Sequence, residues 1–355
     1  MNYKETLLFV AKCLTITHER DNCKLVEEKI KNNTVDWNTI VKVSTAQYVF
    51  PALYCNLKRA DFLHYLPTDL VEYMQHITEL NRKRNEHIIA EAKEINELLL
   101  SNNITPIFLK GTGNLLEGLY EDIAERMVGD IDFLVNPKSF HSTVNLLKKN
   151  GYIEKTPHYI DNTVLNRHYP KITKKGKIAA IEVHYKMISN EKGFDFNFIE
   201  KSVNKLANKT TVLSYGNQVL LTSFNKQVND KGQWTKTISL RNSYDLYRLS
   251  KKTSVKTVLN NFDHSESSYL KNFLAATNYI FNSPQSLEYN KTHKSEKYIK
   301  KVIFFMNTPK KSTHNKRKWE LYFLYKHRFS IILKSFYVKE YRKYLFDKFF
   351  NQPNS

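Results

Sequence analysis

The feature that most constrains the fold of this chain is the stretch RMVGDIDFLV, residues 126–135. Successive side chains of a β-strand point to opposite faces, so Asp130 and Asp132 share one face and Ile131 and Phe133 share the other. The apolar face predicts a strand that packs against a core. The two carboxylates, about 7 Å apart along the strand, repel each other, and a dry environment raises the cost of keeping both charged. A cation at the acidic face would remove this conflict.

A divalent metal ion is such a cation. Mg²⁺ prefers oxygen ligands and usually keeps waters and substrate phosphates, and paired metal ions stabilise both oxygens of a phosphoryl displacement. Mg²⁺ or Mn²⁺ is therefore the cofactor that we expect. An Asp-x-Asp pair also arises about once by chance in a chain of 355 residues. Three other features favour the metal site over a solvated pair of acids.

The first is FLKGTGN, residues 108–114, at a predicted strand-to-helix turn. Gly111 and Gly113 flank Thr112 where the helix begins, and backbone N–H groups at a helix start bind phosphate oxygens. Lys110 adds a positive charge and Thr112 a hydroxyl group. The turn predicts a binding site for the phosphates of a nucleotide.

The other two features flank the acidic strand. Arg126 would either clamp a triphosphate in a bidentate manner or form a salt bridge with the neighbouring acids of EDIAE, residues 121–125. AIEVHYK, residues 180–186, predicts a second strand with Glu182 and His184 on one face. If this strand lies beside the first, Glu182 becomes a third carboxylate, and His184 orients Glu182 or contacts the nucleotide. Alternatively, this face is solvated.

The organisation of the chain is typical of an α+β protein with a small mixed sheet flanked by helices. Residues 1–67 predict short helices, with Asp36 as an N-cap and Pro51 in a first turn. Residues 68–102 predict one long helix capped by Thr68 or Asp69. We expect four parts: a helical N-terminal region (1–100), a compact mixed α/β catalytic core (101–190), a helical C-terminal region (191–308) and a basic aromatic tail (309–355).

Predicted strands in the core follow from short apolar runs bounded by Gly, Pro and Asn. After residue 191 the patterns are helical, including FDFNFIEKSVNKL at 194–206 and SLRNSYDLYRL at 239–249. The predicted strands lie at 104–111, 129–136, 152–157, 167–176 and 177–187.

Composition narrows the class of protein. Apolar residues make up 41% of the chain, enough for a core. No apolar run approaches the roughly 18 residues that span a bilayer, and the N-terminus, with an acid at Glu5, favours a helix over a signal peptide. Three cysteines without a CxxC argue against a disulfide framework and a thiolate zinc site. We expect a soluble, cytoplasmic protein.

The net charge of +20 favours contact with polyanions. Residues 309–350 hold twelve Lys or Arg, three Asp or Glu and twelve aromatic residues. This tail would pack on the core as amphipathic helices, lie on an anionic membrane, or bind nucleic acid.

In order and spacing, LKG (109–111), R…GDIDFLV (126–135) and IEVHYK (181–186) resemble the polymerase-β-type nucleotidyltransferases. The closest likeness is to a bacterial family of uncharacterised nucleotidyltransferases, and it covers roughly residues 70–250. A downstream helix in that family carries an aspartate corresponding to Asp245. The usual turn of the superfamily is hydrophobic-Gly-Gly/Ser, whereas here Lys110 precedes Gly111 and Thr112 stands in for the serine.

The resemblance implies that Asp130, Asp132 and Glu182 hold divalent metal and carry out transfer of an NMP from an NTP, with release of pyrophosphate. Lys110, Gly111, Thr112, Arg126 and His184 would contact the nucleotide. The acceptor would be a small molecule, an RNA or a protein. The alternative is an inactive relative that binds a nucleotide or nucleic acid without turnover.

Overall fold

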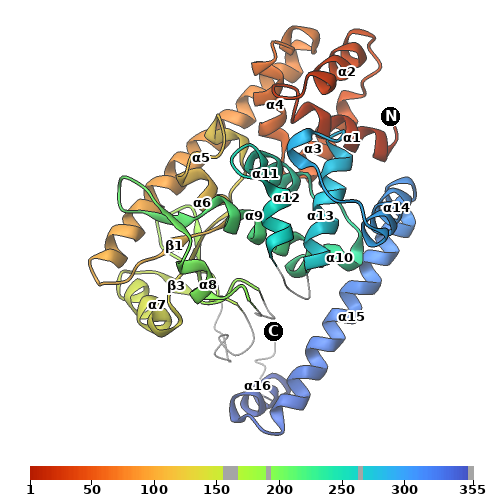
Figure 1. Ribbon diagram of the computed structural model, residues 1–355. Helices are drawn as coiled ribbons and strands as arrows, with labels where there is room; N and C mark the ends of the chain where they lie inside the picture. Colours follow the sequence, from red (N-terminus) through yellow and green to blue (C-terminus); the bar gives the residue numbers. More distant parts are fainter. Residues whose placement is uncertain (155–166, 189–192, 263–266, 351–355) are drawn as a thin grey trace.

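The computed structural model describes residues 1–154, 167–188, 193–262 and 267–350 (Figure 1). Of the predicted strands, part of 152–157 lies outside the described residues.

A seven-stranded mixed sheet forms the centre of the α+β fold, with helical regions on either side in the sequence, as predicted (Figure 1). The strand order is β3-β4-β5-β2-β1-β7-β6. β2 pairs in parallel with β5 and antiparallel with β1, and β1 pairs in parallel with β7. The strands are β1 (Ile107–Phe108), β2 (Asp130–Leu134), β3 (Ile153–Glu154), β4 (Ile172–Thr173), β5 (Ala180–His184), β6 (Val203–Lys205) and β7 (Thr211–Leu213).

Helices precede, interrupt and follow the sheet. Those of the N-terminal half are α1 (Tyr3–Cys13), α2 (Arg20–Lys31), α3 (Trp37–Ala46), α4 (Phe50–Arg59), η1 (Leu63–Tyr65), α5 (Thr68–Leu100), α6 (Lys110–Leu116), η2 (Ile123–Glu125), η3 (Pro137–Ser139) and α7 (Phe140–Lys149). Those of the C-terminal half are α8 (Phe196–Glu200), α9 (Tyr215–Phe224), the π-helical turn η5 (Asn225–Asn229), α10 (Gly232–Thr235), α11 (Leu240–Ser250), α12 (Val255–Asn261), α13 (Ser267–Ile280), η6 (Gln285–Leu287), α14 (His293–Asn307), α15 (Pro309–Ser335) and α16 (Lys339–Phe350).

The N-terminal helices begin largely where local chemistry places them. The Asp36 side chain accepts a hydrogen bond from the Thr39 N–H at 3.1 Å, and Pro51 occupies the first turn of α4. The long helix α5 is also confirmed, but its N-cap is Pro67, with no side-chain capping bond. The predicted caps Thr68 and Asp69 are wrong because both residues already lie inside the first turn.

The helix predicted at 194–206 is mostly wrong. Helix α8 ends at Glu200, and the chain continues as the hairpin β6–β7. The turn holds Lys209 at φ +61°, a left-handed conformation, and the Asn208 side chain accepts from the Thr210 N–H at 3.2 Å. An Asn beside such a turn favours a hairpin over a helix, and β7 then completes the sheet beside β1.

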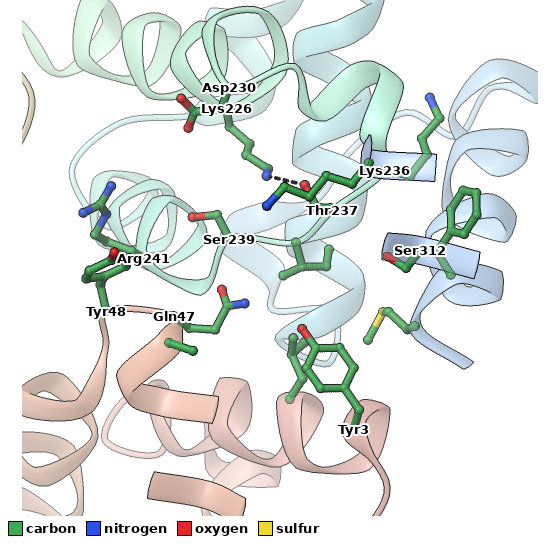
Figure 2. Close-up of a pocket in the computed structure, with 16 residues that line it drawn as sticks. Tyr3, Gln47, Tyr48, Lys226, Asp230, Lys236, Thr237, Ser239, Arg241 and Ser312 are labelled. Atoms are coloured by element: carbon green, nitrogen blue, oxygen red, sulfur yellow. Dashed lines mark hydrogen bonds between the residues drawn. The ribbon is translucent and has the colours of Figure 1, made fainter. Parts of the chain in front are cut away.

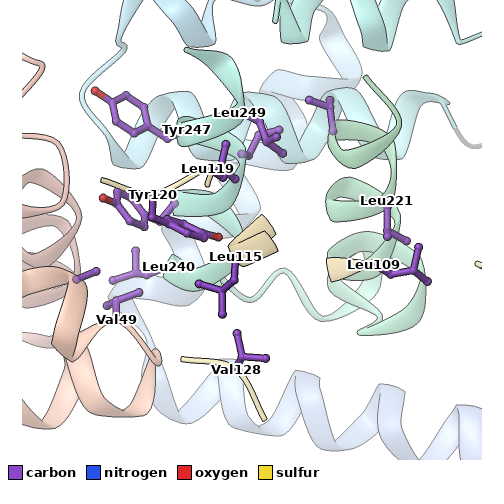
Figure 3. Packing of buried hydrophobic residues seen from close by; sticks show 14 of the residues in the cluster. Val49, Leu109, Leu115, Leu119, Tyr120, Val128, Leu221, Leu240, Tyr247 and Leu249 are labelled. Atoms are coloured by element: carbon purple, nitrogen blue, oxygen red, sulfur yellow. The ribbon is translucent and has the colours of Figure 1, made fainter. Parts of the chain in front are cut away.

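The core is continuous from the N-terminal helices to the sheet and the C-terminal helices. Figure 3 shows part of it, where Leu115, Val128 and Leu240 from three distant segments belong to one buried cluster. Helix α5 runs along the body and contacts α4, η2 and α6. It thereby joins the N-terminal helices to the sheet (Figure 1).

The C-terminal helices lie differently. The first half of α15 packs on α10, where the Asn315 amide donates to the Thr235 carbonyl at 3.0 Å and Trp319 lies near Trp234. Beyond this contact, α15 extends away from the body toward α16 (Figure 1). Within the described ranges, no helix is both long and apolar enough for a bilayer crossing.

The close contact between α6 and β1 generates a first prediction. A Cβ atom at Gly113 would lie 2.7 Å from the Phe108 carbonyl oxygen, whereas a Cβ at Gly129 would meet nothing within 4 Å. Gly113→Ala should therefore lower the free energy of unfolding by about 1–3 kcal/mol through overpacking, which outweighs the helix propensity that alanine gains. Gly129→Ala is the matched control. Equal urea midpoints for the two variants would contradict this account.

Candidate active site

The parallel pairing of β2 with β5 brings the acidic residues of the two strands together. Asp132 lies directly opposite Glu182 in the register, and the exposed fractions are only 7% and 8%. The Nε2 atom of His184 lies 2.9 Å from Asp132 Oδ1 and 3.4 Å from Glu182 Oε2. One ligand atom from each of the three residues falls within 4.8 Å of the others.

Two lysines neutralise this buried acidic pair. Lys110 Nζ lies 2.5 Å from Asp132 Oδ1 and 3.5 Å from Glu182 Oε2. Lys171 Nζ lies 3.4 Å from Glu182 Oε1 and 2.6 Å from Asp130 Oδ2. A buried carboxylate is stable when it is paired in this way, so each acid of β2 and β5 has a cation beside it.

The neighbours of Glu182 hold it in the ionised form. Burial alone would raise the pKa of Glu182, but the hydrogen bond from His184 and the charge of Lys110 outweigh burial and lower that pKa well below its ordinary value. Burial likewise opposes the charge of Lys110, yet Asp132 and Glu182 raise the pKa of its ammonium group. At neutral pH, Glu182 is therefore negatively charged and Lys110 positively charged.

His184 acts as a hydrogen-bond donor in this arrangement. An ionised carboxylate can only accept, and Nε2 faces Asp132 and Glu182, so Nε2 must carry the proton. His168 lies next to it, with ring centroids 4.9 Å apart and its Nε2 3.9 Å from Glu182 Oε2. Burial lowers the pKa of His168.

Asp130 lies at the edge of the cluster. It is more exposed than Asp132, and its carboxylate pairs with Lys171. The compact group of potential metal ligands is thus Asp132, Glu182 and His184, whereas Asp130 reaches Glu182 only through the Lys171 ammonium.

The glycine-containing turn lies beside the acids but differs from the expectation in detail. Lys110 has φ +52°, a left-handed conformation, where α6 begins, and a Cβ at Gly111 would lie 2.8 Å from Val128 Cγ2. The Thr112 hydroxyl is fully buried and donates to the Asp130 carbonyl at 2.9 Å. In this structure Thr112 therefore holds the start of β2, and its predicted contact with phosphate stays a prediction.

Of the two predicted roles of Arg126, the salt bridge with the EDIAE acids is wrong, and the triphosphate clamp stays a prediction. The buried guanidinium pairs with Asp245 on α11, with Nη2 2.9 Å from Oδ2, and Tyr120 donates to the same carboxylate at 2.6 Å. The EDIAE acids bind elsewhere, since Glu125 pairs with Arg59 at 2.5 Å. Arg126 also lines a cavity of about 170 Å³ whose wall includes Lys110 and Arg167.

Helix α5 fixes the segment that leads into β2. The side-chain amide of Asn85 donates to the Arg126 carbonyl at 2.7 Å and that of Asn81 to the Ala124 carbonyl at 2.7 Å. Arg84 Nε donates to the Val128 carbonyl at 3.2 Å. These bonds fix the backbone just before β2 and therefore the positions of Asp130 and Asp132.

Sequence reasoning missed Lys171 and His168, along with the asparagines of α5. Lys171 and His168 belong to RHYPK, residues 167–171, at the start of a segment that the sequence predicts as a strand. His168 forms a bridge with His184 beside β5. Basic residues on a strand next to an acidic strand were the available signal, since unlike charges pair across strands.

The buried Arg126–Asp245 pair predicts a large effect on stability. Asp245→Asn should leave the guanidinium without its counter-charge and lower the free energy of unfolding by about 3–5 kcal/mol. Asp61→Asn is the matched control, because Asp61 is exposed at φ +60°, a conformation that Asn adopts readily. Urea denaturation followed by circular dichroism measures both, and a midpoint for Asp245→Asn equal to that of the control would show that the pair adds no stability.

The chain is similar to one family of known proteins. The family model described as "Uncharacterised nucleotidyltransferase" matches residues 33–268, which include β2, β5 and Asp245. No curated protein and no solved structure matches the chain. The family model covers more than half of the chain and confirms the predicted family and the assignment as an enzyme. The chain belongs to the uncharacterised nucleotidyltransferase family.

Proposed function

We propose that the chain transfers an NMP from an NTP to an acceptor, with release of pyrophosphate, at the pair formed by Asp132 and Glu182. The observation that carries this proposal is their register: the two acids lie directly opposite each other on adjacent parallel strands. Two ionised carboxylates at one buried point are costly for stability alone, so a functional reason for the pair is favoured.

The residues present fit a divalent metal ion. Asp132 and Glu182 supply hard oxygen ligands, the type that Mg²⁺ and Mn²⁺ prefer, and Glu182 remains ionised because His184 and Lys110 lower its pKa. Asp130 would join them once Lys171 turns away from its carboxylate. When bound, the ion would neutralise charge on the triphosphate and the leaving pyrophosphate.

The chain's own cations would bind the phosphates. Lys110 pairs with Asp132 and Glu182 and also lines the adjacent cavity of about 170 Å³, so its ammonium group would bind a phosphate there. Arg167 and Arg241 line the same cavity. We infer that the triphosphate lies between the acids and this cavity, with Gly111 allowing close approach of the turn.

Roles within the acidic pair follow from its electrostatics. A carboxylate whose pKa is far below the ordinary value is a weak base. Glu182 is therefore better suited to hold a cation than to deprotonate the acceptor hydroxyl. His184 positions both carboxylates through its Nε2–H group.

The rival function is binding of a nucleotide or nucleic acid without turnover. A protein that only binds would need the basic cavity but not a buried, registered pair of acids. The retained pair of Asp132 and Glu182 supports catalysis.

The test is transfer of label from α-labelled NTPs to a broad acceptor pool, measured together with pyrophosphate release. Asp130→Asn, Asp132→Asn and Glu182→Gln should each lower the rate, the last two by at least about 100-fold, because even residues behind the metal ligands contribute 10–100-fold. EDTA should stop the reaction, and Mg²⁺ or Mn²⁺ should restore it.

Glu97→Gln is the control, since Glu97 is an exposed acid on α5. Circular dichroism establishes that each variant is folded. Transfer at the wild-type rate by folded Asp132→Asn and Glu182→Gln would place the reaction elsewhere. NTP binding without any transfer would favour the rival function.

For the basic aromatic tail we propose contact with an anionic membrane surface from the cytoplasmic side. Large apolar side chains of α15, of α16 and of the residues between the two helices are exposed among lysines and arginines. Nucleic acid binding needs cations and aromatic rings, whereas exposed aliphatic side chains favour a lipid surface. The exposed set is Leu321, Tyr322, Leu324, Tyr325, Phe329, Ile332, Leu333, Phe336, Tyr337, Phe346 and Phe349.

Co-sedimentation with vesicles of phosphatidylglycerol and phosphatidylcholine tests this contact. Phe329→Ser combined with Phe336→Ser should weaken binding roughly 10-fold or more, since each buried aromatic side chain contributes about 1.5–3 kcal/mol. Tyr3→Ser and Tyr73→Ser, which remove exposed rings outside the tail, form the control. Retention on an RNA column with no binding to vesicles would contradict the proposal.

A further inference from the structure

A second cavity, of about 460 Å³, lies between the N-terminal helices, η5, α14 and α15 (Figure 2). Residues of α1, α3, the 236–239 segment and α15 form its walls. Its lining shares Asp230 and Arg241 with the smaller cavity beside Lys110, so the two cavities adjoin. The proposed transfer reaction does not use it.

The charge of this cavity is unbalanced. Lys226, Lys236, Arg241 and Lys316 line it, against one acid, Asp230. Among the residues that the structure describes, none of these four cations has a carboxylate within 4.0 Å except Lys316, which lies 3.8 Å from Glu320. An anion inside the cavity would meet several cations that the protein leaves without a counter-charge.

Lys226 is the most informative of these residues. The residue is only 6% exposed, and among the residues that the structure describes its ammonium group donates one hydrogen bond, to the Thr237 hydroxyl at 3.0 Å (Figure 2). An ammonium group has three donors, and burying it without a carboxylate is costly. Burial lowers the pKa of Lys226 to about 8, despite the opposing charge of Asp230.

The backbone around Lys226 has an unusual conformation and is closely packed. Lys226 lies in the π-helical turn η5, a rare conformation that occurs often at functional sites. A Cβ at Gly232 would lie 2.5 Å from the Lys226 carbonyl oxygen, so only glycine lets α10 approach the turn so closely. Lys231 and Lys236, on either side of α10, both have positive φ.

The lining of the cavity also includes apolar and aromatic side chains. Leu7, Ile238, Phe305 and Met306 belong to it, and the ring of Tyr3 lies across the cavity from Lys226 (Figure 2). A volume of about 460 Å³ is in the range of small-molecule sites, which combine apolar walls with a few polar groups. The ligand should therefore carry an anionic group and a compact apolar or aromatic part.

We propose that this cavity binds a small phosphate monoester, with the phosphate at Lys226 and the organic part against Leu7 and Phe305. A phosphate dianion matches several cations better than a carboxylate does, because it carries more charge and more acceptor oxygens. The site does not depend on the proposed nucleotidyl transfer. Because the cavity adjoins the one beside Lys110, a phosphate ester held there would be close to the candidate active site.

Isothermal titration calorimetry of the full-length protein with phenyl phosphate tests the site. Lys226→Met, which keeps the length of the side chain, should weaken binding about 10-fold or more, since it removes a charged hydrogen bond. Lys318→Met removes an exposed charge from α15 outside the cavity and should change the affinity less than about 2-fold. Benzoate should bind more weakly than phenyl phosphate.

Two further variants make the outcome decisive. The double variant Asp132→Asn and Glu182→Gln should bind phenyl phosphate as the wild type does, which separates this site from the candidate active site. If Lys226→Met does not fold, Lys316→Met, on the exposed side of the cavity, should weaken binding instead.

Equal affinity of the folded Lys226→Met protein and the wild type would overturn the proposal. So would loss of binding in the double variant, because the ligand would then occupy the acidic site, or tighter binding of benzoate than of phenyl phosphate. None of these outcomes depends on whether the protein transfers nucleotides.

Discussion

The contact on which the rest of the structure depends is the placement of Asp132 opposite Glu182 on adjacent parallel strands. Two buried like charges are unfavourable, and Lys110, Lys171 and His184 compensate them at distances of 2.5–3.5 Å. His184 and Lys110 thereby hold the pKa of Glu182 well below its ordinary value. The same lysines pair with the acids of both strands, so the acidic face and its counter-charges form one cluster.

Buried polar contacts around the segment before β2 set the position of this pair. The amides of Asn81 and Asn85 on α5 hold the segment before β2, and Arg126 within that segment pairs with Asp245 on α11. Helices α5 and α11, which lie far apart in the sequence, therefore both hold the segment that leads into β2. Because such pairs are costly when one member is lost, substitutions far from the acids should disturb the site through the strand.

Much of the site, but less of its surroundings, could be predicted from the sequence. The period-two alternation in β2 and β5 was sufficient to place Asp132, Glu182 and His184 on one face, because alternation is a local property. The partner of Arg126 lies 119 residues away, and no local pattern identifies it. Strands of two or three residues such as β6 and β7 show no periodicity. The hydrogen bond from the Thr112 hydroxyl to the Asp130 carbonyl also joins two separate segments, and no local pattern predicts it.

The parallel pairing of β2 and β5 has a consequence for how the protein assembles. Parallel neighbours cannot be joined by a tight turn, so the chain leaves β2 at Leu134 and begins β5 only at Ala180, after α7, β3 and β4. Closing a loop of this length costs chain entropy before any contact repays it. The acidic pair forms only when this long segment closes, and a nascent chain that still lacks β5 has Asp130 and Asp132 but not Glu182.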